Sequence, residues 1–261
     1  MQSRMVDEDR VRVKATATSF RVVDALVDLG GAGVTELADH LGLSKSGVHN
    51  HLTTLEELGY VVRDGDTFRA SLRFLRTGTR VRRDRRLYRV AAGEIGRLAR
   101  ASGVVAGAFA LEDGETVCLY CAAGGKVERP ILAAGDVRPL HCTAPGKAIL
   151  AASPEETVDA LLDDAGLREY TDSTVTDRDR LREELQRVRA RGLAFDREEH
   201  EPAVRGIATA VEDANGAVLG AVGVVSSTEF MSGKRFQQDL PGLVISSANR
   251  VEKSVLNESS D

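Results

Sequence analysis

Cysteine is scarce in this sequence of 261 residues, which contains only three, and long hydrophobic runs are absent. Three cysteines cannot make a disulfide framework, and no pair of them has further metal-ligating residues nearby, so we expect no metal and no cofactor. The longest apolar stretch, residues 104–111, is far shorter than the ~20 residues that a membrane helix needs. The first nine residues carry four charges and do not resemble a signal peptide. These absences predict a soluble, cytoplasmic protein with no membrane partner.

Charge is distributed unevenly along the chain, although the net charge is only −5. Residues 1–75 carry a net charge of −2, residues 76–100 carry +7, and residues 101–261 carry −10. A basic segment between two acidic ones indicates a domain boundary near residues 76–90. The arginine run from Arg80 to Arg89 fits a solvated helix face, and an extension of phosphate contacts remains a second interpretation.

The periodicity of apolar residues predicts three short helices and then a β-hairpin, at residues 18–29, 34–41, 45 to about 58, 60–63 and 67–70. Gly42 permits the tight turn between the second and third helices. Ala38 precedes it by four residues and Val48 follows it by six, as the crossing of two helices requires. Ser44 is a suitable N-cap for the third helix. The pattern predicts a winged helix-turn-helix.

The candidate DNA contacts are the outward and N-terminal residues of the third helix and one arginine of the hairpin: Ser44, Lys45, Ser46, Gly47, His49, Asn50, Thr53 and Arg63. A lysine can meet phosphate or guanine, an asparagine pairs with adenine, and serines donate to phosphate. The acidic residues of this region are expected mostly on the back of the domain, away from the first two turns of the third helix: Asp24, Asp28, Glu36, Asp39, Glu56 and Glu57. Double-stranded DNA is therefore the favoured partner.

Two other interpretations apply to the same domain. Winged helices also dock to proteins, and a domain with a net charge of −2 lacks the basic footprint of many nucleic-acid binders. His49 and His51 lie two residues apart, but without a third ligand they are expected to be polar surface rather than a metal site.

The second half of the chain predicts an antiparallel sheet with helices. Turn dipeptides separate two pairs of strands, 104–111 from 116–121 and 207–211 from 217–225. One or two helices are expected over residues 72–101. Further helices are expected from an N-cap at Ser153 to about residue 162, from an N-cap at Thr176 to Gly192, and over residues 240–255. The fold class is α+β.

Three segments in this order, residues 34–46, 138–150 and 189–199, resemble the isocitrate lyase regulator (IclR) family of transcription factors. The amino-acid usage, with an acidic second half, is similar to that of haloarchaeal members. The resemblance implies a GAF-like C-terminal domain that binds a small organic effector. It implies effector contacts at Ala144, Pro145, Gly146, Asp196, Gly206, Gly223 and Val225. Residues 143–147 would point free backbone N–H groups at the ligand.

The implied site departs from the family pattern, in which members with carboxylate effectors place cysteine or serine at positions where this chain has Gly206, Gly223 and Val225. Pro145 also removes one backbone donor. The pocket is therefore expected to be roomier and less polar, and an organic acid, a sugar-derived compound and an aromatic compound remain open as effectors.

An enzyme with an accessory winged helix is the third hypothesis, because His141 and Cys142 precede Asp196 in the chain. Neighbours on an extended segment point to opposite faces, which disfavours a thiol–imidazole pair. We expect the three cysteines to be small buried residues, and Lys147 to be a surface or helix-start cation rather than a catalytic amine.

The sequence thus predicts a tail (1–11), a winged helix-turn-helix (12–75), a linker helix (76–90), an effector domain (91–255) and a second tail (256–261). The expected function is regulation of a metabolic operon. The linker helix would mediate a homodimer or tetramer, and the effector would change the spacing of two recognition helices.

Overall fold

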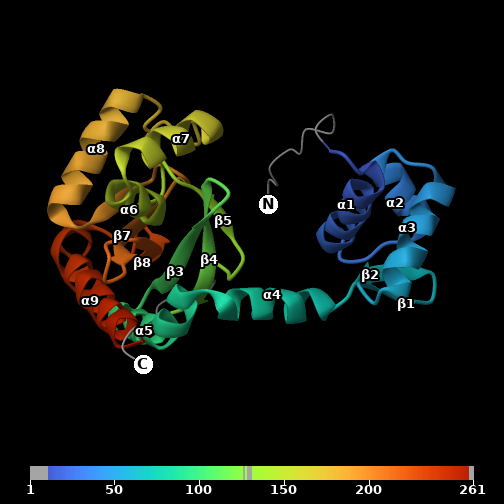
Figure 1. Cartoon of the computed structure of the whole chain (residues 1–261), viewed down its shortest axis with the longest axis horizontal. Coiled ribbons are helices and arrows are strands. Elements are labelled where there is room, and N and C mark those ends of the chain that lie inside the picture. The colour runs from blue at the N-terminus through green and yellow to red at the C-terminus, as the bar shows by residue number, and fades with distance from the viewer. Residues whose placement is uncertain (1–10, 126, 128–130, 259–261) are drawn as a thin grey trace. The chain divides into compact units, whose positions relative to one another are not determined.

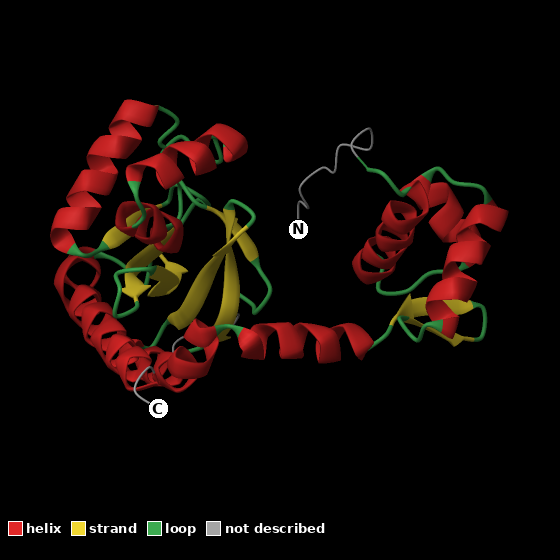
Figure 2. Cartoon of the chain, viewed as in Figure 1, coloured by secondary structure: helices red, strands yellow, loops and turns green. Residues whose placement is uncertain are grey.

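The structure is a computed structural model that describes residues 11–125, 127 and 131–258. The chain separates into two compact units, with the division between Val81 and Arg82. The N-terminal unit is mostly helical, whereas the C-terminal unit combines a sheet with helices (Figures 1 and 2). Within the described ranges, no helix is long and apolar enough to span a bilayer. The α+β prediction is confirmed.

Three helices and a hairpin build the N-terminal unit: α1 (Lys14–Asp28), α2 (Val34–Leu41), α3 (Lys45–Glu57), β1 (Val61–Asp64) and β2 (Thr67–Ala70). Their apolar faces meet in one core, which includes Leu26, Leu37, Val48, Leu52 and Phe68. The wing gains a short third segment, since Ala32 and Phe68 exchange two backbone hydrogen bonds of 3.0 and 2.9 Å. The winged helix-turn-helix is confirmed, and the bridge at Ala32 is an addition to the prediction.

The turn between α2 and α3 depends on Gly42, whose φ of 66° lies in the left-handed region. The N–H groups of Gly42 and Leu43 both donate to the carbonyl of Ala38, the latter at 2.9 Å. Ser44 then caps α3, because its hydroxyl accepts from the Gly47 N–H at 3.1 Å. Both features agree with the sequence-based prediction.

Two helices follow the wing, α4 (Arg73–Asp84) and α5 (Arg86–Ser102). Of the one or two helices expected over residues 72–101 the structure has two, and residues 76–90 do not form one continuous linker helix, because Arg85 is extended, with a ψ of 120°. No residue of α4 is buried. α5 instead belongs to the core of the C-terminal unit, into which it packs Leu87, Ile95 and Leu98.

Six antiparallel strands form the sheet of the C-terminal unit in the order β5-β4-β3-β8-β7-β6. They are β3 (Val105–Glu112), β4 (Glu115–Ala122), β5 (Val137–Pro139), β6 (Ala194–Arg197), β7 (Val204–Glu212) and β8 (Val218–Ser227). Both predicted hairpins are present, and they join in the middle of the sheet because β3 pairs with β8. The edge strands β5 and β6 were not predicted.

Helices cover both faces of this sheet (Figure 1). On one face, α5 and α9 (Leu240–Glu258) pack around Ala91, Ile95, Val244 and Val251. On the other face, α6 (Ala144–Ala152), α7 (Glu155–Ala165) and α8 (Arg178–Arg191) form a second core around Ile149, Leu162 and Leu181. A smaller apolar cluster on the same side of β3 contains Val105, Phe109, Cys118 and Leu132.

Two predicted helix starts are wrong. Ser153 does not cap α7, because it also ends α6 and its hydroxyl donates back to the Ile149 carbonyl at 2.8 Å. α8 is capped by Asp177 rather than Thr176, since the Asp177 carboxylate accepts from the Arg180 N–H at 2.8 Å. A π-helical turn, residues 235–239, precedes α9 and was not predicted.

Candidate functional sites

The N-terminal half of α3 presents a polar surface to solvent. Six of the predicted DNA contacts are exposed and Gly47 is half-buried, the exposed ones being Ser44, Lys45, Ser46, His49, Asn50 and Thr53. The opposite side of α3 is held in the core by Val48, Leu52 and Leu55. Helical periodicity therefore brings the predicted residues together at the positive end of the helix dipole. The size and donor pattern of this face suit a major groove.

Arg63 lies on the wing, where its guanidinium is already engaged. Its Nε donates to the Gly65 carbonyl at 2.8 Å, one terminal nitrogen lies 3.7 Å from the Asp66 carboxylate, and the group lies over the ring of Phe68. Exposed ion pairs of this kind contribute little, so a DNA phosphate can compete for the same guanidinium.

Acidic residues lie closer to the recognition helix than predicted. A surface hollow is lined by His49 and Arg63 together with Glu36, Asp39 and Asp66. The expectation that Glu36 and Asp39 face away from the DNA-contacting surface is therefore wrong, because the N-terminal turns of α2 border the side of α3 that carries His49. Their charges weaken the attraction of this edge for phosphate.

A hollow lies in the C-terminal unit between the sheet and the start of α6, and its volume of about 490 Å³ includes space open to solvent. Much of its wall is apolar, with contributions from Phe109, Ile131, Leu132, Val204, Ile207, Val224 and Val225. We refer to this hollow as the ligand cavity.

Six of the seven implied effector contacts line the ligand cavity: Ala144, Pro145, Asp196, Gly206, Gly223 and Val225. Gly146 does not line it. A Cβ at Gly146 would lie 2.2 Å from the Leu140 carbonyl oxygen, so this glycine allows α6 to pack against the preceding segment.

The start of α6 offers fewer free donors than predicted. The Gly146 N–H donates to the Thr143 hydroxyl at 3.3 Å, and the Lys147 N–H donates to the Thr143 carbonyl at 2.9 Å. Pro145 has no N–H. The expectation that residues 143–147 aim a set of free N–H groups at a ligand is therefore wrong.

Arg138 and His200 give the ligand cavity a polar end that sequence reasoning missed. One terminal nitrogen of Arg138 lies 3.2 Å from His200 Nδ1, and the other donates to the Ile131 carbonyl at 3.0 Å. The carboxylates of Asp136 and Glu201 each lie 3.7 Å from the guanidinium. These groups form one polar end of a cavity whose wall is otherwise mostly apolar. Arg138 belongs to a recognised motif, but no spacing indicated that it would face His200, which lies 62 residues away.

Burial controls the protonation of two groups in this wall. The pKa of His200 falls to about 4, because burial and then the charge of Arg138 disfavour the imidazolium, so the ring is neutral at pH 7. Burial also raises the pKa of Asp196 to about 7, although its carboxylate accepts the Glu199 N–H at 2.9 Å. Asp196 is therefore divided between carboxyl and carboxylate near neutral pH.

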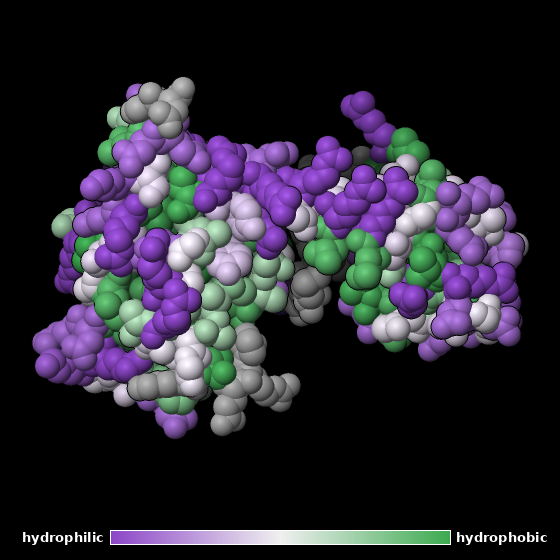
Figure 3. Space-filling model, turned by 90° about the horizontal axis from the view of Figure 1, so that it is seen from below, coloured by the Kyte–Doolittle hydropathy of each residue, from purple (hydrophilic) through white to green (hydrophobic). Residues whose placement is uncertain are grey.

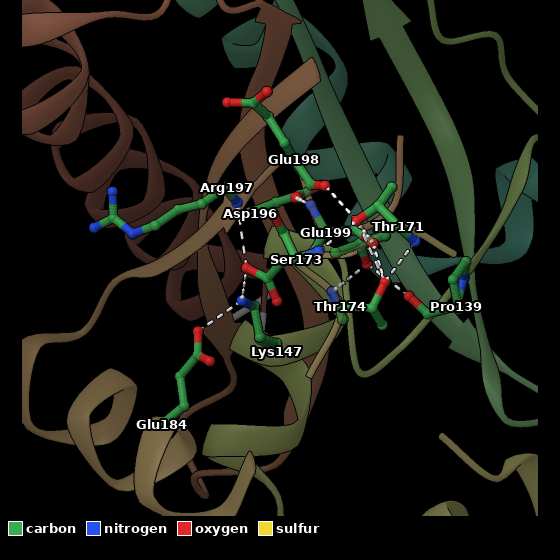
Figure 4. Close-up of polar contacts among 12 residues, drawn as sticks. Pro139, Lys147, Thr171, Ser173, Thr174, Glu184, Asp196, Arg197, Glu198 and Glu199 are labelled. Carbon is green, nitrogen blue, oxygen red and sulfur yellow. Dashed lines mark hydrogen bonds and ion pairs between the residues drawn. The ribbon is translucent and has the colours of Figure 1, made fainter. Parts of the chain in front are cut away.

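Lys147 is near the start of α6, as one of the two predicted alternatives has it, but it is fully buried, so the alternative of a surface cation is wrong. Its Nζ donates to Glu184 Oε1 on α8 and to Glu199 Oε1 after β6, both at 2.6 Å (Figure 4). Burial raises the pKa of Glu199, an effect that the charge of Lys147 opposes. The three side chains tie α6, α8 and the end of β6 together beside Asp196.

The turn after β6 holds Glu199 and His200 in place. Glu198 has a φ of 68°, a left-handed conformation that costs energy for a residue with a side chain. The hydroxyl of Thr171 donates to the Glu198 carbonyl at 2.7 Å, and the hydroxyl of Thr174 donates to the Glu199 carbonyl at 2.6 Å (Figure 4). These bonds explain how the turn keeps its shape at the edge of the ligand cavity.

The two units correspond to two known domain families. Residues 17–65 match the IclR helix-turn-helix domain, and residues 80–253 match the bacterial transcriptional regulator IclR C-terminal domain. The chain belongs to the IclR family of transcriptional regulators. As an IclR-family protein, it is a DNA-binding regulator of metabolic operons whose effector binds in the C-terminal domain, and it is not an enzyme.

A curated relative is similar over most of both chains, and two solved structures share the fold. The probable HTH-type transcriptional regulator ArcR of Halobacterium salinarum, a haloarchaeon, is 29% identical over 92% of this chain and 93% of its own. The crystal structure of IclR from Thermotoga maritima superposes with a TM-score of 0.80 at 22% identity, covering 93% of this chain and 98% of that one. The crystal structure of an IclR homologue from Microbacterium hydrocarbonoxydans superposes with a TM-score of 0.78 at 20% identity, covering 92% of this chain and 98% of that one.

The enzyme hypothesis fails for a chemical reason as well. Cys142 is fully buried, and burial strongly raises the pKa of its thiol. A nucleophilic cysteine needs its thiolate, which this environment disfavours. The neighbouring His141 uses its Nε2 in a 2.9 Å contact with the Arg168 carbonyl.

Proposed function

We propose that the exposed N-terminal half of α3 enters the major groove of operator DNA. The observation that carries this proposal is the division of α3 into a buried apolar side and an exposed side with Lys45, Ser46 and Asn50. The amide of Asn50 matches the donor and acceptor of adenine, and Lys45 matches phosphate or guanine. Serines at the helix start donate to phosphate.

A labelled duplex from the DNA upstream of the protein's own coding region tests the proposal. We expect binding to be at least about 1,000-fold tighter than to a shuffled duplex of the same length, as for other specific binders. Equal binding to both duplexes, together with capture of a protein partner by the winged helix, would support the docking alternative instead.

We also propose that the effector is a carboxylate with an apolar, preferably aromatic, body. The wall of the ligand cavity supplies apolar contacts, and Arg138 supplies a planar guanidinium that suits a carboxylate. Asp196 contributes a polar group elsewhere in the same wall. The Microbacterium homologue was crystallised with 4-hydroxybenzoate, which has this chemistry.

Thermal unfolding with 4-hydroxybenzoate, pyruvate and gluconate as probes distinguishes the three effector classes left open by the sequence. A ligand that binds only the folded protein raises the melting temperature with concentration. We expect 4-hydroxybenzoate to raise it most and Arg138→Met to abolish that increase. A larger increase with gluconate would contradict an apolar ligand.

We propose finally that the protein acts as a homodimer assembled through α4. Apolar side chains reach the surface in several patches (Figure 3), and among the exposed ones are Leu72, just before α4, and Leu75 and Val81 within it. A two-fold dimer would read half-sites about 34 Å apart or a multiple of that distance. Light scattering should give about twice the chain mass of 28.0 kDa, and Leu75→Glu should lower it. A mass unchanged by the substitution would contradict the role of α4.

A further inference from the structure

A β-bulge places two cysteines of β4 on the same face of the sheet. Cys118 pairs with Phe109 of β3, but the next pair joins Tyr120 to Ala108, so Leu119 is an extra residue. In a regular strand, residues three apart point to opposite faces. Here Cys118 and Cys121 both join the apolar cluster around Phe109, whereas Leu119 and Tyr120 pack with the core under α5 and α9.

The strand register also sets the spacing of the two cysteines. Cys118 lies opposite Phe109 and Cys121 lies opposite Gly107, which are two residues apart on β3. Two residues of a strand span roughly 6.6 Å. This value lies within the range of about 4.4–6.8 Å between the α carbons of a disulfide. Without the bulge, the separation along the strand would be about 10 Å and a bridge would be impossible.

The two thiols differ in environment. Cys118 is buried and Cys121 is partly exposed. The pKa of Cys121 falls to about 7, chiefly because the Cys118 thiol donates a hydrogen bond to its sulfur. The same bond, together with burial, raises the pKa of Cys118. At neutral pH, Cys121 therefore supplies a reactive thiolate, and Cys118 keeps its proton beside it.

We propose that Cys118 and Cys121 form a reversible oxidation site for peroxides, at which the two thiols close to a disulfide within β4. The Cys121 thiolate attacks one peroxide oxygen, the O–O bond breaks, and the leaving hydroxide takes a proton to become water. The Cys118 sulfur then displaces hydroxide from the sulfenic acid on Cys121, and the Cys118 proton completes a second water. Two thiols are oxidised and one hydrogen peroxide is reduced to two waters.

This site adjoins the ligand cavity. In its protonated form, Cys121 donates to the Leu132 carbonyl at 3.4 Å, and Leu132 and Phe109 line the cavity. A disulfide removes that hydrogen bond and draws β4 together at the bulge, next to Phe109. Oxidation would thereby reshape one wall of the cavity. The proposal does not depend on which effector binds there.

Thiol mapping on the full chain tests the proposal. The reduced protein is treated with hydrogen peroxide at pH 7.5, its free thiols are blocked with N-ethylmaleimide, and peptides are analysed by mass spectrometry. We expect the peptide with Cys118 and Cys121 to lose two hydrogens and to escape blocking, and dithiothreitol to restore both thiols. Cys142, which is fully buried, should stay reduced.

Two variants sharpen the result. Cys118→Ala should stop at a sulfenic acid on Cys121, which dimedone traps, and the midpoint of Cys121 alkylation should move from about pH 7 to a higher pH. Cys142→Ala should behave like the unaltered chain. The proposal is overturned if the unaltered chain keeps both β4 thiols free under peroxide, if Cys142 reacts first, or if the disulfides formed join two chains.

Discussion

Lys45 is the first residue of α3, with its ammonium group in solvent beside the serine cap. A lysine that contacts phosphate adds to affinity for any sequence and releases about one counterion. Lys45→Ala should therefore weaken binding to all duplexes alike and reduce the slope of log affinity against log salt by about one. Lys253→Ala, on the exposed side of α9, is the matched control. An unchanged slope for Lys45→Ala would remove Lys45 from the interface.

Asp196 should make stability depend on pH, because burial raises its folded-state pKa to about 7 while an unfolded aspartate titrates near 3.9. The folded state then holds the proton more tightly, so this contribution is complete below about pH 4 and is lost as pH rises through 7. The free energy of unfolding of Asp196→Asn, relative to that of the unaltered chain, should therefore rise by about 3 kcal/mol between pH 4 and pH 8.

Urea unfolding at the two pH values measures this difference. Asp28→Asn, on the exposed part of α1, should show no such gain and serves as the control. Parallel pH profiles for Asp196→Asn and the unaltered chain would mean that Asp196 is ionised throughout and that the buried carboxyl is absent.

At this scale, residue type and local spacing predicted some roles and missed others. The cap at Ser44 and the left-handed Gly42 follow from chemistry within four residues, and the structure has both. The burial of Lys147 was not predicted, because its partners, Glu184 and Glu199, lie 37 and 52 residues away in the chain. A buried charge is readable only with its partner, and no local pattern indicates that partner.

The ion pairs of Lys147 connect α6, α8 and the end of β6, so their effect belongs to the scale of elements. Lys147→Met would leave Glu199 buried and unpaired, at a cost of about 3–5 kcal/mol at pH 7. This loss of stability should be smaller at pH 5 than at pH 7, since protonation of Glu199 removes its unpaired charge. Denaturant unfolding at both pH values measures it. Lys253→Met is the control, and a loss no larger than that of the control would show that the pair contributes nothing.

Elements with a strong local signal were predictable, and those defined by tertiary pairing were not. The hairpins β3–β4 and β7–β8 have turn dipeptides between apolar strands, and both form. β5 and β6 are three and four residues long and exist only because they pair with the edges of that sheet. The position of the break at Arg85 between α4 and α5 was not predicted for a related reason, since arginine is a good helix former.

For the molecule as a whole, two separate cores predict two unfolding transitions. α4 contributes no buried residue at the division between the units, so each core should melt with its own cooperativity. Calorimetry of the full chain should resolve two steps, and 4-hydroxybenzoate should raise the temperature of the C-terminal step. Isolated residues 82–261 serve as the reference for that step. A single unfolding transition for the whole chain, with its temperature raised by 4-hydroxybenzoate, would contradict independent unfolding of the two cores.

The order of the two domains was readable from charge and motif order, because a basic segment separates two acidic regions. The polar end of the ligand cavity was not readable, since it combines β5, the turn after β6 and the start of α6. The sequence therefore identified six residues that line the cavity, and it missed His200 and also Arg138, although Arg138 lies within a motif.

The exposed side of α3 is expected to read base sequence, and fluorescence anisotropy with an upstream duplex and its shuffled counterpart tests this most directly. Loss of a bidentate contact from Asn50 to adenine removes about 1–3 kcal/mol of discrimination. Asn50→Ala should therefore lower the preference for the upstream duplex by about 5- to 150-fold, while Asn249→Ala, exposed on α9, should leave it unchanged. Equal preference in all three proteins would contradict the central claim.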